Sequence, residues 1–188
     1  MSNIEIHPLT ARRWADFEKL FGPRGAYGGC WCMYWRLRSR DNARNTGEDN
    51  KRAMKHIVDS EERPGLLVYV EDEPAGWCSI DPREKFLRLE HSRTLKRVDD
   101  RPGVWSLNCF VIARKHRRHG LMTALLDAAV EHARQRGAKI LEAYPIEHAS
   151  DLKSYDGYTG IASTFRRRGF REVARPRETQ VTMRLELT

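Results

Sequence analysis

The sequence predicts an α/β (α+β) domain of three layers, with a mixed central sheet of about six to seven strands flanked by helices. Two observations predict it. Apolar runs of strand length recur along the chain, and amphipathic runs of helix length stand between them. The 188 residues contain no internal repeat and are enough for one sizeable core, so we expect one domain over residues 1–188.

The first half of the chain is predicted to run strand, helix, loop, helix, strand, strand. Thr10 is placed to cap the first helix, which runs toward Phe21 with Trp14 and Phe17 on its inner face. The other predicted elements are a strand over residues 4–8, an irregular loop over 22–46, a helix over 48–62, strands over 65–70 and 75–80 joined by a hairpin, and a polar connection over 83–98.

The second half contains the most informative stretch. An apolar run over residues 104–112 predicts a buried strand, a basic loop follows, and after Gly120 apolar residues recur at helical spacing until Gly137. We then expect a strand over 139–146, a short helix from Thr159 that ends at 169–170, and strands over 170–174 and 180–187.

A strand that is followed by a basic turn and then by a helix is an arrangement that binds a phosphate. Free backbone N–H groups and the positive end of the helix dipole point out of the helix start. Gly120 has no Cβ, so a ligand can approach its backbone closely. The loop has neither the GxxxxGK[ST] nor the GxGxxG pattern of other phosphate loops.

The turn Arg117-x-x-Gly120-x-Met122 resembles the R/QxxGxG/A signature of the GCN5-related N-acetyltransferases (the GNAT family). Met122 departs from that signature, which has Gly or Ala at this position. Residues 166–170 resemble the late helix of the family, which ends in xxxGF, and the order of elements extends the resemblance over most of the chain. The GGCWC segment at residues 28–32 is similar to that of uncharacterised bacterial members of the family.

The resemblance implies a GNAT-like fold and an acyl-CoA-dependent N-acetyltransferase that moves the acetyl group of acetyl-CoA directly to an amine. In the family this turn binds the pyrophosphate of the cosubstrate, and backbone groups of the preceding strand bind the adjoining part of the same molecule. The implied cofactor-binding residues are Phe110, Val111, Arg117, Arg118, His119, Gly120, Leu121, Met122 and Thr123.

Acetyl transfer requires a deprotonated amine, a polarised carbonyl and help for the leaving thiolate. The family's usual proton donor is a tyrosine four residues before the helix-ending glycine, and Phe165 stands there. Tyr158 and Tyr144 are the nearest phenols in the sequence, and an unassisted thiolate is the alternative. Glu142 is the candidate base, ahead of the less favoured Glu90 and His91. The alternative for Glu142 is a solvated strand residue.

Aromatic side chains crowd the loop over residues 22–46. A loop of this length in a compact domain usually has a function, and in such acetyltransferases this region often lines the acceptor pocket. Tyr27, Trp31, Tyr34 and Trp35 are therefore candidate substrate-binding residues. The alternative is that their rings anchor the loop to the core.

The cysteines do not predict a metal site. Cys30-x-Cys32 lacks the second pair of ligands that tetrahedral zinc needs. Cys78 and Cys109 lie in apolar strands and are expected to be small core residues. A thioester-forming cysteine would need a lowered thiol pKa, which a sequence does not reveal.

The net charge of +8 leaves a second class of function open. Basic clusters at residues 114–118 and 166–171 suit the phosphates of CoA, but a non-catalytic CoA-binding or basic nucleic-acid-binding protein is the alternative. No recognition helix or RNA-stacking motif supports nucleic acid as a partner. We expect a small-molecule or peptide amine acceptor, a monomer or homodimer, and a cytoplasmic location without a membrane span.

Overall fold

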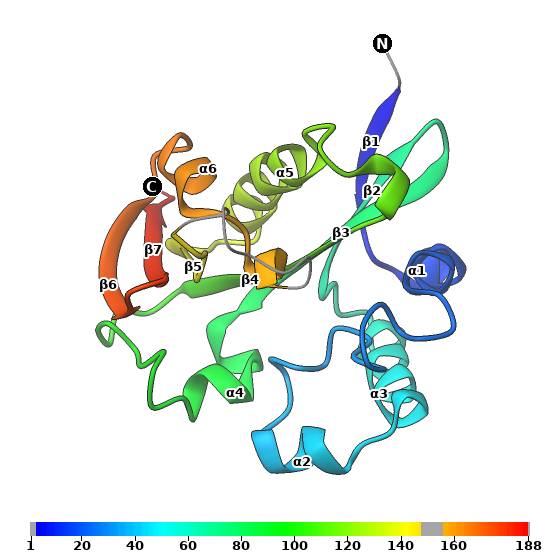
Figure 1. Cartoon of the computed structure of the whole chain (residues 1–188), viewed down its shortest axis with the longest axis horizontal. Helices are drawn as coiled ribbons and strands as arrows, with labels where there is room; N and C mark the ends of the chain where they lie inside the picture. Colours follow the sequence, from blue (N-terminus) through cyan, green and yellow to red (C-terminus); the bar gives the residue numbers. More distant parts are fainter. Residues whose placement is uncertain (1–2, 148–155, 188) are drawn as a thin grey trace.

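A seven-stranded mixed sheet forms the middle layer of the molecule (Figure 1). The structure is a computed structural model that describes residues 3–147 and 156–187. The strand order is β1-β2-β3-β4-β5-β7-β6; β4 and β5 run parallel, and the other neighbours are antiparallel. The strands are β1 (Ile4–Pro8), β2 (Gly65–Val70), β3 (Glu73–Pro82), β4 (Val104–Ile112), β5 (Ile140–Ala143), β6 (Arg171–Arg177) and β7 (Gln180–Glu186). The expected three-layer architecture is confirmed.

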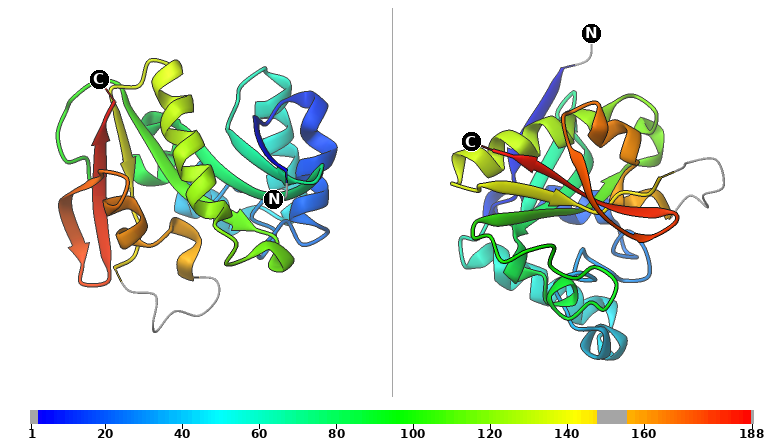
Figure 2. Two further views of the ribbon diagram at one scale, coloured as in Figure 1. Left: turned by 90° about the horizontal axis from the view of Figure 1, so that it is seen from above. Right: turned by 90° about the vertical axis from the view of Figure 1, so that its left-hand side faces the viewer.

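Helices cover both faces of the sheet (Figure 2). One core lies between the sheet and α5 and α6, and a second lies between the sheet and α1, α3 and α4. The α-helices are α1 (Trp14–Phe21), α2 (Ser39–Arg44), α3 (Gly47–Asp59), α4 (Leu87–Glu90), α5 (Leu121–Gln135) and α6 (Ala162–Arg166). Short 3₁₀ turns are η1 (Ala11–Arg13), η2 (Arg83–Lys85), η3 (Arg114–His116) and η4 (Asp156–Thr159). Within the described residues, no helix is long and apolar enough to cross a membrane.

Local sequence signals explain several element boundaries. Thr46 caps α3 in a capping box with Asp49: the Asp49 amide donates to the Thr46 hydroxyl, and the Thr46 amide donates to the Asp49 carboxylate. Glu71 and Asp72 join β2 to β3 with φ angles of +51° and +65°, as a two-residue hairpin turn requires. The predicted cap at Thr10 is wrong, because its side chain makes no capping hydrogen bond and α1 begins only at Trp14.

Candidate active site

The parallel strands β4 and β5 separate halfway along β4. Their pairing ends at Leu107 and Ala143, whereas β4 continues to Ile112. Asn108 is an extra residue in the pairing of β4 with β3, because Ser79 pairs with Cys109 and Ile80 with Leu107. The amide nitrogen and oxygen of the buried Asn108 side chain have no hydrogen-bond partner in the described part of the chain. Beyond Leu107, β4 therefore has no paired strand on the side of β5, and the η4 turn lies beside it there.

The turn between β4 and α5 presents unpaired backbone donors. None of the amides of residues 118–123 donates a hydrogen bond to a described residue, and the first amide that does so is that of Ala124, to the Gly120 carbonyl at 3.1 Å. Arg118 and Gly120 have φ angles of +64° and +79°, in the left-handed region. The positive end of the α5 dipole adds to these donors, so the turn attracts an anion.

Basic side chains line the cavity beside this turn. Arg114, Arg117 and Arg118 all contribute to its wall. The Arg117 Nε donates to the Ile112 carbonyl at 3.2 Å, which folds this side chain back along the end of β4. Their charges reinforce the attraction of the amides for a phosphate.

The cavity has a volume of about 1020 Å³ and extends from the turn to the aromatic loop. We call it the large cavity. Its wall includes five of the nine predicted cofactor-binding residues: Phe110, Val111, Arg117, Arg118 and Met122. His119, Gly120, Leu121 and Thr123 do not line it, and the Leu121 side chain packs into the α5 core. The backbone amides of these four residues belong to the unpaired row at residues 118–123.

The four aromatic residues of the long loop have two different positions. Tyr27, Tyr34 and Trp35 line the large cavity. Trp31 does not, which corrects its prediction as a substrate-binding residue. It is only 4% exposed and stacks on Phe21, with ring centroids 5.8 Å apart, so it anchors the loop to α1.

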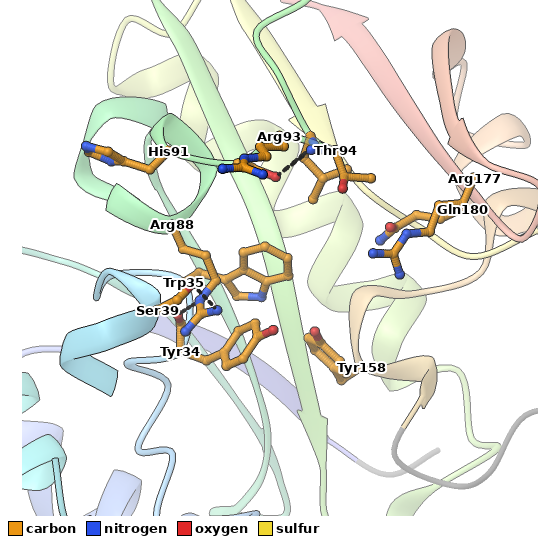
Figure 3. A pocket seen from close by; sticks show the side chains of 12 residues that line it. Tyr34, Trp35, Ser39, Arg88, His91, Arg93, Thr94, Tyr158, Arg177 and Gln180 are labelled. Atoms are coloured by element: carbon orange, nitrogen blue, oxygen red, sulfur yellow. Dashed lines mark hydrogen bonds between the residues drawn. The ribbon is translucent and has the colours of Figure 1, made fainter. Parts of the chain in front are cut away.

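A second hollow, the small cavity, adjoins the large one. It has a volume of about 420 Å³ and shares Tyr34, Trp35 and Tyr158 with the large cavity. Figure 3 shows Arg177 and Gln180 reaching toward it from one side and Arg88 and Tyr34 lying on the other. Its remaining lining residues are Ser39, His91, Ser92, Arg93, Thr94 and Leu95. The Nδ1 of His91 contacts the Leu87 carbonyl at 2.8 Å, and its ring points away from this hollow in Figure 3.

Glu142 is completely buried in an ion cluster, so the prediction of a solvated strand residue is wrong. The Arg83 Nε donates to its Oε1 at 3.1 Å, and the Arg184 Nε donates to its Oε2 at 2.7 Å. The Tyr144 hydroxyl donates to Oε1 at 2.6 Å. Burial, together with the adjacent carboxylate of Glu142, raises the pKa of the Tyr144 phenol. Neither residue lines either cavity, so we expect both to stabilise the fold rather than to act in catalysis.

Like Tyr34, Tyr158 is a phenol that lines both cavities. Its exposed fraction is 36%, and its ring lies 6.5 Å from that of Trp35. Burial raises the pKa of Tyr158, with Tyr34 and Cys109 adding to the effect, so its hydroxyl keeps its proton. Phe165, by contrast, is fully buried against Phe170, with ring centroids 5.1 Å apart.

Three free cysteines, Cys30, Cys32 and Cys109, also line the large cavity. A hydrogen bond from Cys109, supported by one from Trp77, lowers the pKa of the Cys32 thiol to about 7. The Trp77 Nε1 donates to the Cys32 Sγ at 3.1 Å. The described part of the chain contains no group of three or more His, Cys, Asp or Glu side chains placed to hold a metal ion.

Several lining residues were missed by the sequence analysis. Arg88 and Arg93 lie on α4 and the loop after it, and only the folded chain brings Arg177 of β6 to them. Arg114 could have been found, because it belongs to the basic cluster before Gly120.

Comparisons with known proteins point to one family. The model of the acetyltransferase (GNAT) family matches residues 31–156. No curated protein matches the chain. Among solved structures, it is similar to an N-acetyltransferase from Staphylococcus aureus Mu50, with 11% identity, a TM-score of 0.57 and complete coverage of both chains.

Two further solved structures show the same fold. The protein yncA from Salmonella typhimurium, solved with its cofactor acetyl-CoA, is 14% identical with a TM-score of 0.55, over 98% of this chain and 94% of that one. The ribosomal-protein-S18-alanine N-acetyltransferase from Escherichia coli is 14% identical with a TM-score of 0.51, over 99% of this chain and 95% of that one.

Proposed function

The chain belongs to the acetyltransferase (GNAT) family, and on that premise we propose that it transfers the acetyl group of acetyl-CoA directly to a primary amine. The observation that carries this proposal is the row of unpaired amides at residues 118–123, at the end of a cavity that extends to Tyr158. The acetyl-CoA bound to yncA and the amine acceptor named for the Escherichia coli enzyme agree with the proposal.

The cosubstrate fits the large cavity in a defined direction. Its pyrophosphate accepts hydrogen bonds from the amides of residues 118–123, and Arg114 and Arg118 lie beside it. The pantetheine arm follows the unpaired part of β4 past Val111 and Phe110, where it takes the place of a neighbouring strand. The thioester then lies near Cys109 and Tyr158, where the two cavities meet.

At the junction, the neutral amine attacks the thioester carbonyl carbon. The new bond joins nitrogen to carbon, and the carbon–sulfur bond of the tetrahedral intermediate then breaks. The protonated Tyr158 hydroxyl donates a hydrogen bond or a proton to the leaving sulfur. No described residue that lines the large cavity is a carboxylic acid or a histidine, so the ammonium proton leaves to water.

The alternative of a nucleic-acid-binding surface receives less support from the charges. The arginines of the second basic cluster are partly neutralised. Arg166 donates to Glu147 at 2.6 Å, and Arg168 donates to Asp127 at 2.9 Å. Arg114, Arg117 and Arg118, in contrast, line a cavity, which suits a small phosphorylated ligand better than a duplex.

The test is acetyl transfer from acetyl-CoA to a panel of primary amines, followed as release of the CoA thiol and as acetylated product by mass spectrometry. We expect both signals to appear in equal amounts with at least one amine. Failure to bind acetyl-CoA would contradict the proposal. Binding without any transfer would leave the chain as a non-catalytic CoA-binding protein.

In the same assay, Tyr158→Phe tests whether Tyr158 donates to the leaving sulfur or only packs against its neighbours, because the variant removes only the hydroxyl. We expect turnover to fall by about ten- to a hundredfold, toward the lower range for one proton donor because Tyr158 is partly exposed. The affinity for acetyl-CoA should change little. Tyr69→Phe is the control, since the Tyr69 hydroxyl donates to Asp16 at 2.8 Å and the residue lines neither cavity. Unchanged turnover would assign Tyr158 to packing and favour an unassisted thiolate.

A further inference from the structure

We propose that the acceptor carries an anionic group, a carboxylate or a phosphate, beside its amine, and that the small cavity binds this group. The inference rests on the proposed acetyl transfer and names the class of acceptor. Three arginines, Arg88, Arg93 and Arg177, line the small cavity together with the amide of Gln180. None of its described lining residues is an aspartate or a glutamate.

Arg88 is held in place before any ligand binds. Its Nε donates to the Tyr34 carbonyl at 2.6 Å, and its Nη1 donates to the Ser39 hydroxyl at 2.9 Å. Its guanidinium also lies over the Tyr34 ring, 3.9 Å from the centroid. A fixed guanidinium with remaining N–H donors is suited to a carboxylate or a phosphate, because little side-chain entropy is lost when the anion binds.

Arg93 and Arg177 are exposed and have no carboxylate partner among the described residues. Two nearby arginines in the sequence, in contrast, do have carboxylate partners. Arg175 forms ion pairs with Glu147 and Glu172, and Arg97 donates to Glu90 at 2.8 Å. Arg93 and Arg177 are therefore available to an external anion that enters the small cavity.

Trp35 supplies a second, independent sign of a ligand. It is 7% exposed and lines both cavities, yet its indole Nε1 has no hydrogen-bond partner in the described chain. A buried donor without an acceptor is costly, and a bound polar ligand would satisfy it. The acceptor would therefore place its amine near the thioester, while the oxygen atoms of its anionic group face Trp35 and the arginines.

The two basic groups of the site are separate. Arg114, Arg117 and Arg118 line only the large cavity, whereas Arg88, Arg93 and Arg177 line only the small one. The phosphates of the cosubstrate account for the first group and leave the second unassigned. Cations near the acceptor also favour the neutral form of its amine, which is the form that attacks the thioester.

The experiment compares acceptors in matched pairs. Each α-amino acid is assayed beside its carboxamide, and each aminoalkyl phosphate beside the corresponding amino alcohol, so that the two arms distinguish carboxylate from phosphate. Acetyl transfer gives kcat/KM. Calorimetry on the CoA-bound enzyme measures the affinity for the N-acetylated form of every compound, which does not depend on turnover.

For the better arm, we expect the anionic member of a pair to be favoured at least about tenfold in both measurements, as for hydrogen bonds to a charged group. The double variant Arg93→Gln/Arg177→Gln, which keeps only Arg88 in the small cavity, should reduce this preference several-fold, with little change for the uncharged member or for the affinity for CoA. Arg12→Gln/Arg63→Gln is the matched control, because both arginines are exposed, have no ion-pair partner among the described residues and line neither cavity.

Equal kcat/KM and equal affinity for both members of every pair would overturn the inference, as would a preference that is undiminished in the double variant. Absence of binding for every anionic compound would overturn it as well. All three results leave acetyl-CoA binding intact, whereas failure of the proposed function would appear as a parent protein that does not bind acetyl-CoA.

Discussion

The Gly120→Val variant is expected to bind acetyl-CoA at least about a hundredfold more weakly than the parent protein, because several hydrogen bonds to a charged group are lost together. Gly120 has a φ of +79°, a conformation that a β-branched residue adopts only with strain. A Cβ at this position meets no protein atom within 4 Å, so the added side chain occupies the space beside the free amides. Calorimetry with CoA and acetyl-CoA measures the loss.

Gly137→Val is the matched control for this variant. Gly137 follows the other end of α5, has a φ of +82° and likewise leaves open space around an added Cβ. Both variants carry the same backbone strain and should lose similar stability, which thermal unfolding measures. Only Gly120→Val should lose the cosubstrate. Equal CoA affinity in the two variants would show that the turn at Gly120 does not hold the pyrophosphate.

The Glu142→Gln variant is expected to lower the free energy of unfolding by about 3 kcal/mol or more, since it leaves two buried guanidinium groups without their shared carboxylate. Arg83 and Arg184 both donate to Glu142, and their side chains are 1% and 3% exposed. Glu186→Gln is the control. Glu186 lies on the neighbouring strand and pairs with Arg101 at the surface, so its loss should have a small effect.

Urea unfolding of both variants measures the difference in stability, and turnover is then compared under conditions in which each variant is folded. We expect the folded Glu142→Gln enzyme to retain acetyl transfer, because Glu142 lines neither cavity. Normal stability combined with lost turnover would reverse this assignment and restore Glu142 as the base.

The turn that carries the site could be predicted from the sequence because its determinants are local. The apolar run of β4, the basic residues, Gly120 and the helical spacing of α5 follow one another within about thirty residues, and each depends on its neighbours in the chain. The resemblance to the family then predicted that this turn binds the pyrophosphate of acetyl-CoA. The family match is confirmed, whereas the roles of the individual residues stay predictions.

The errors have a common physical cause. Trp31 and Tyr34 belong to the same aromatic loop, and only tertiary packing buries the first against α1 and places the second in the cavity wall. Glu142 is the one carboxylate in the apolar run of residues 140–144, and a lone carboxylate in a strand is usually solvated. Glu142 is buried because Arg83 and Arg184, distant in the sequence, neutralise it. Contacts between residues so far apart in the sequence leave no local pattern that could be read from it.

Hydrogen–deuterium exchange of the backbone amides tests the central claim most directly, because it reports on the donors that are proposed to bind the cosubstrate. The amides of residues 118–123 have no partner among the described residues, so they should exchange quickly in the free protein. Saturating acetyl-CoA should slow their exchange markedly, with a smaller change in the later turns of α5. Unchanged exchange at residues 118–123 under saturating acetyl-CoA, with protection elsewhere, would contradict the proposed binding site.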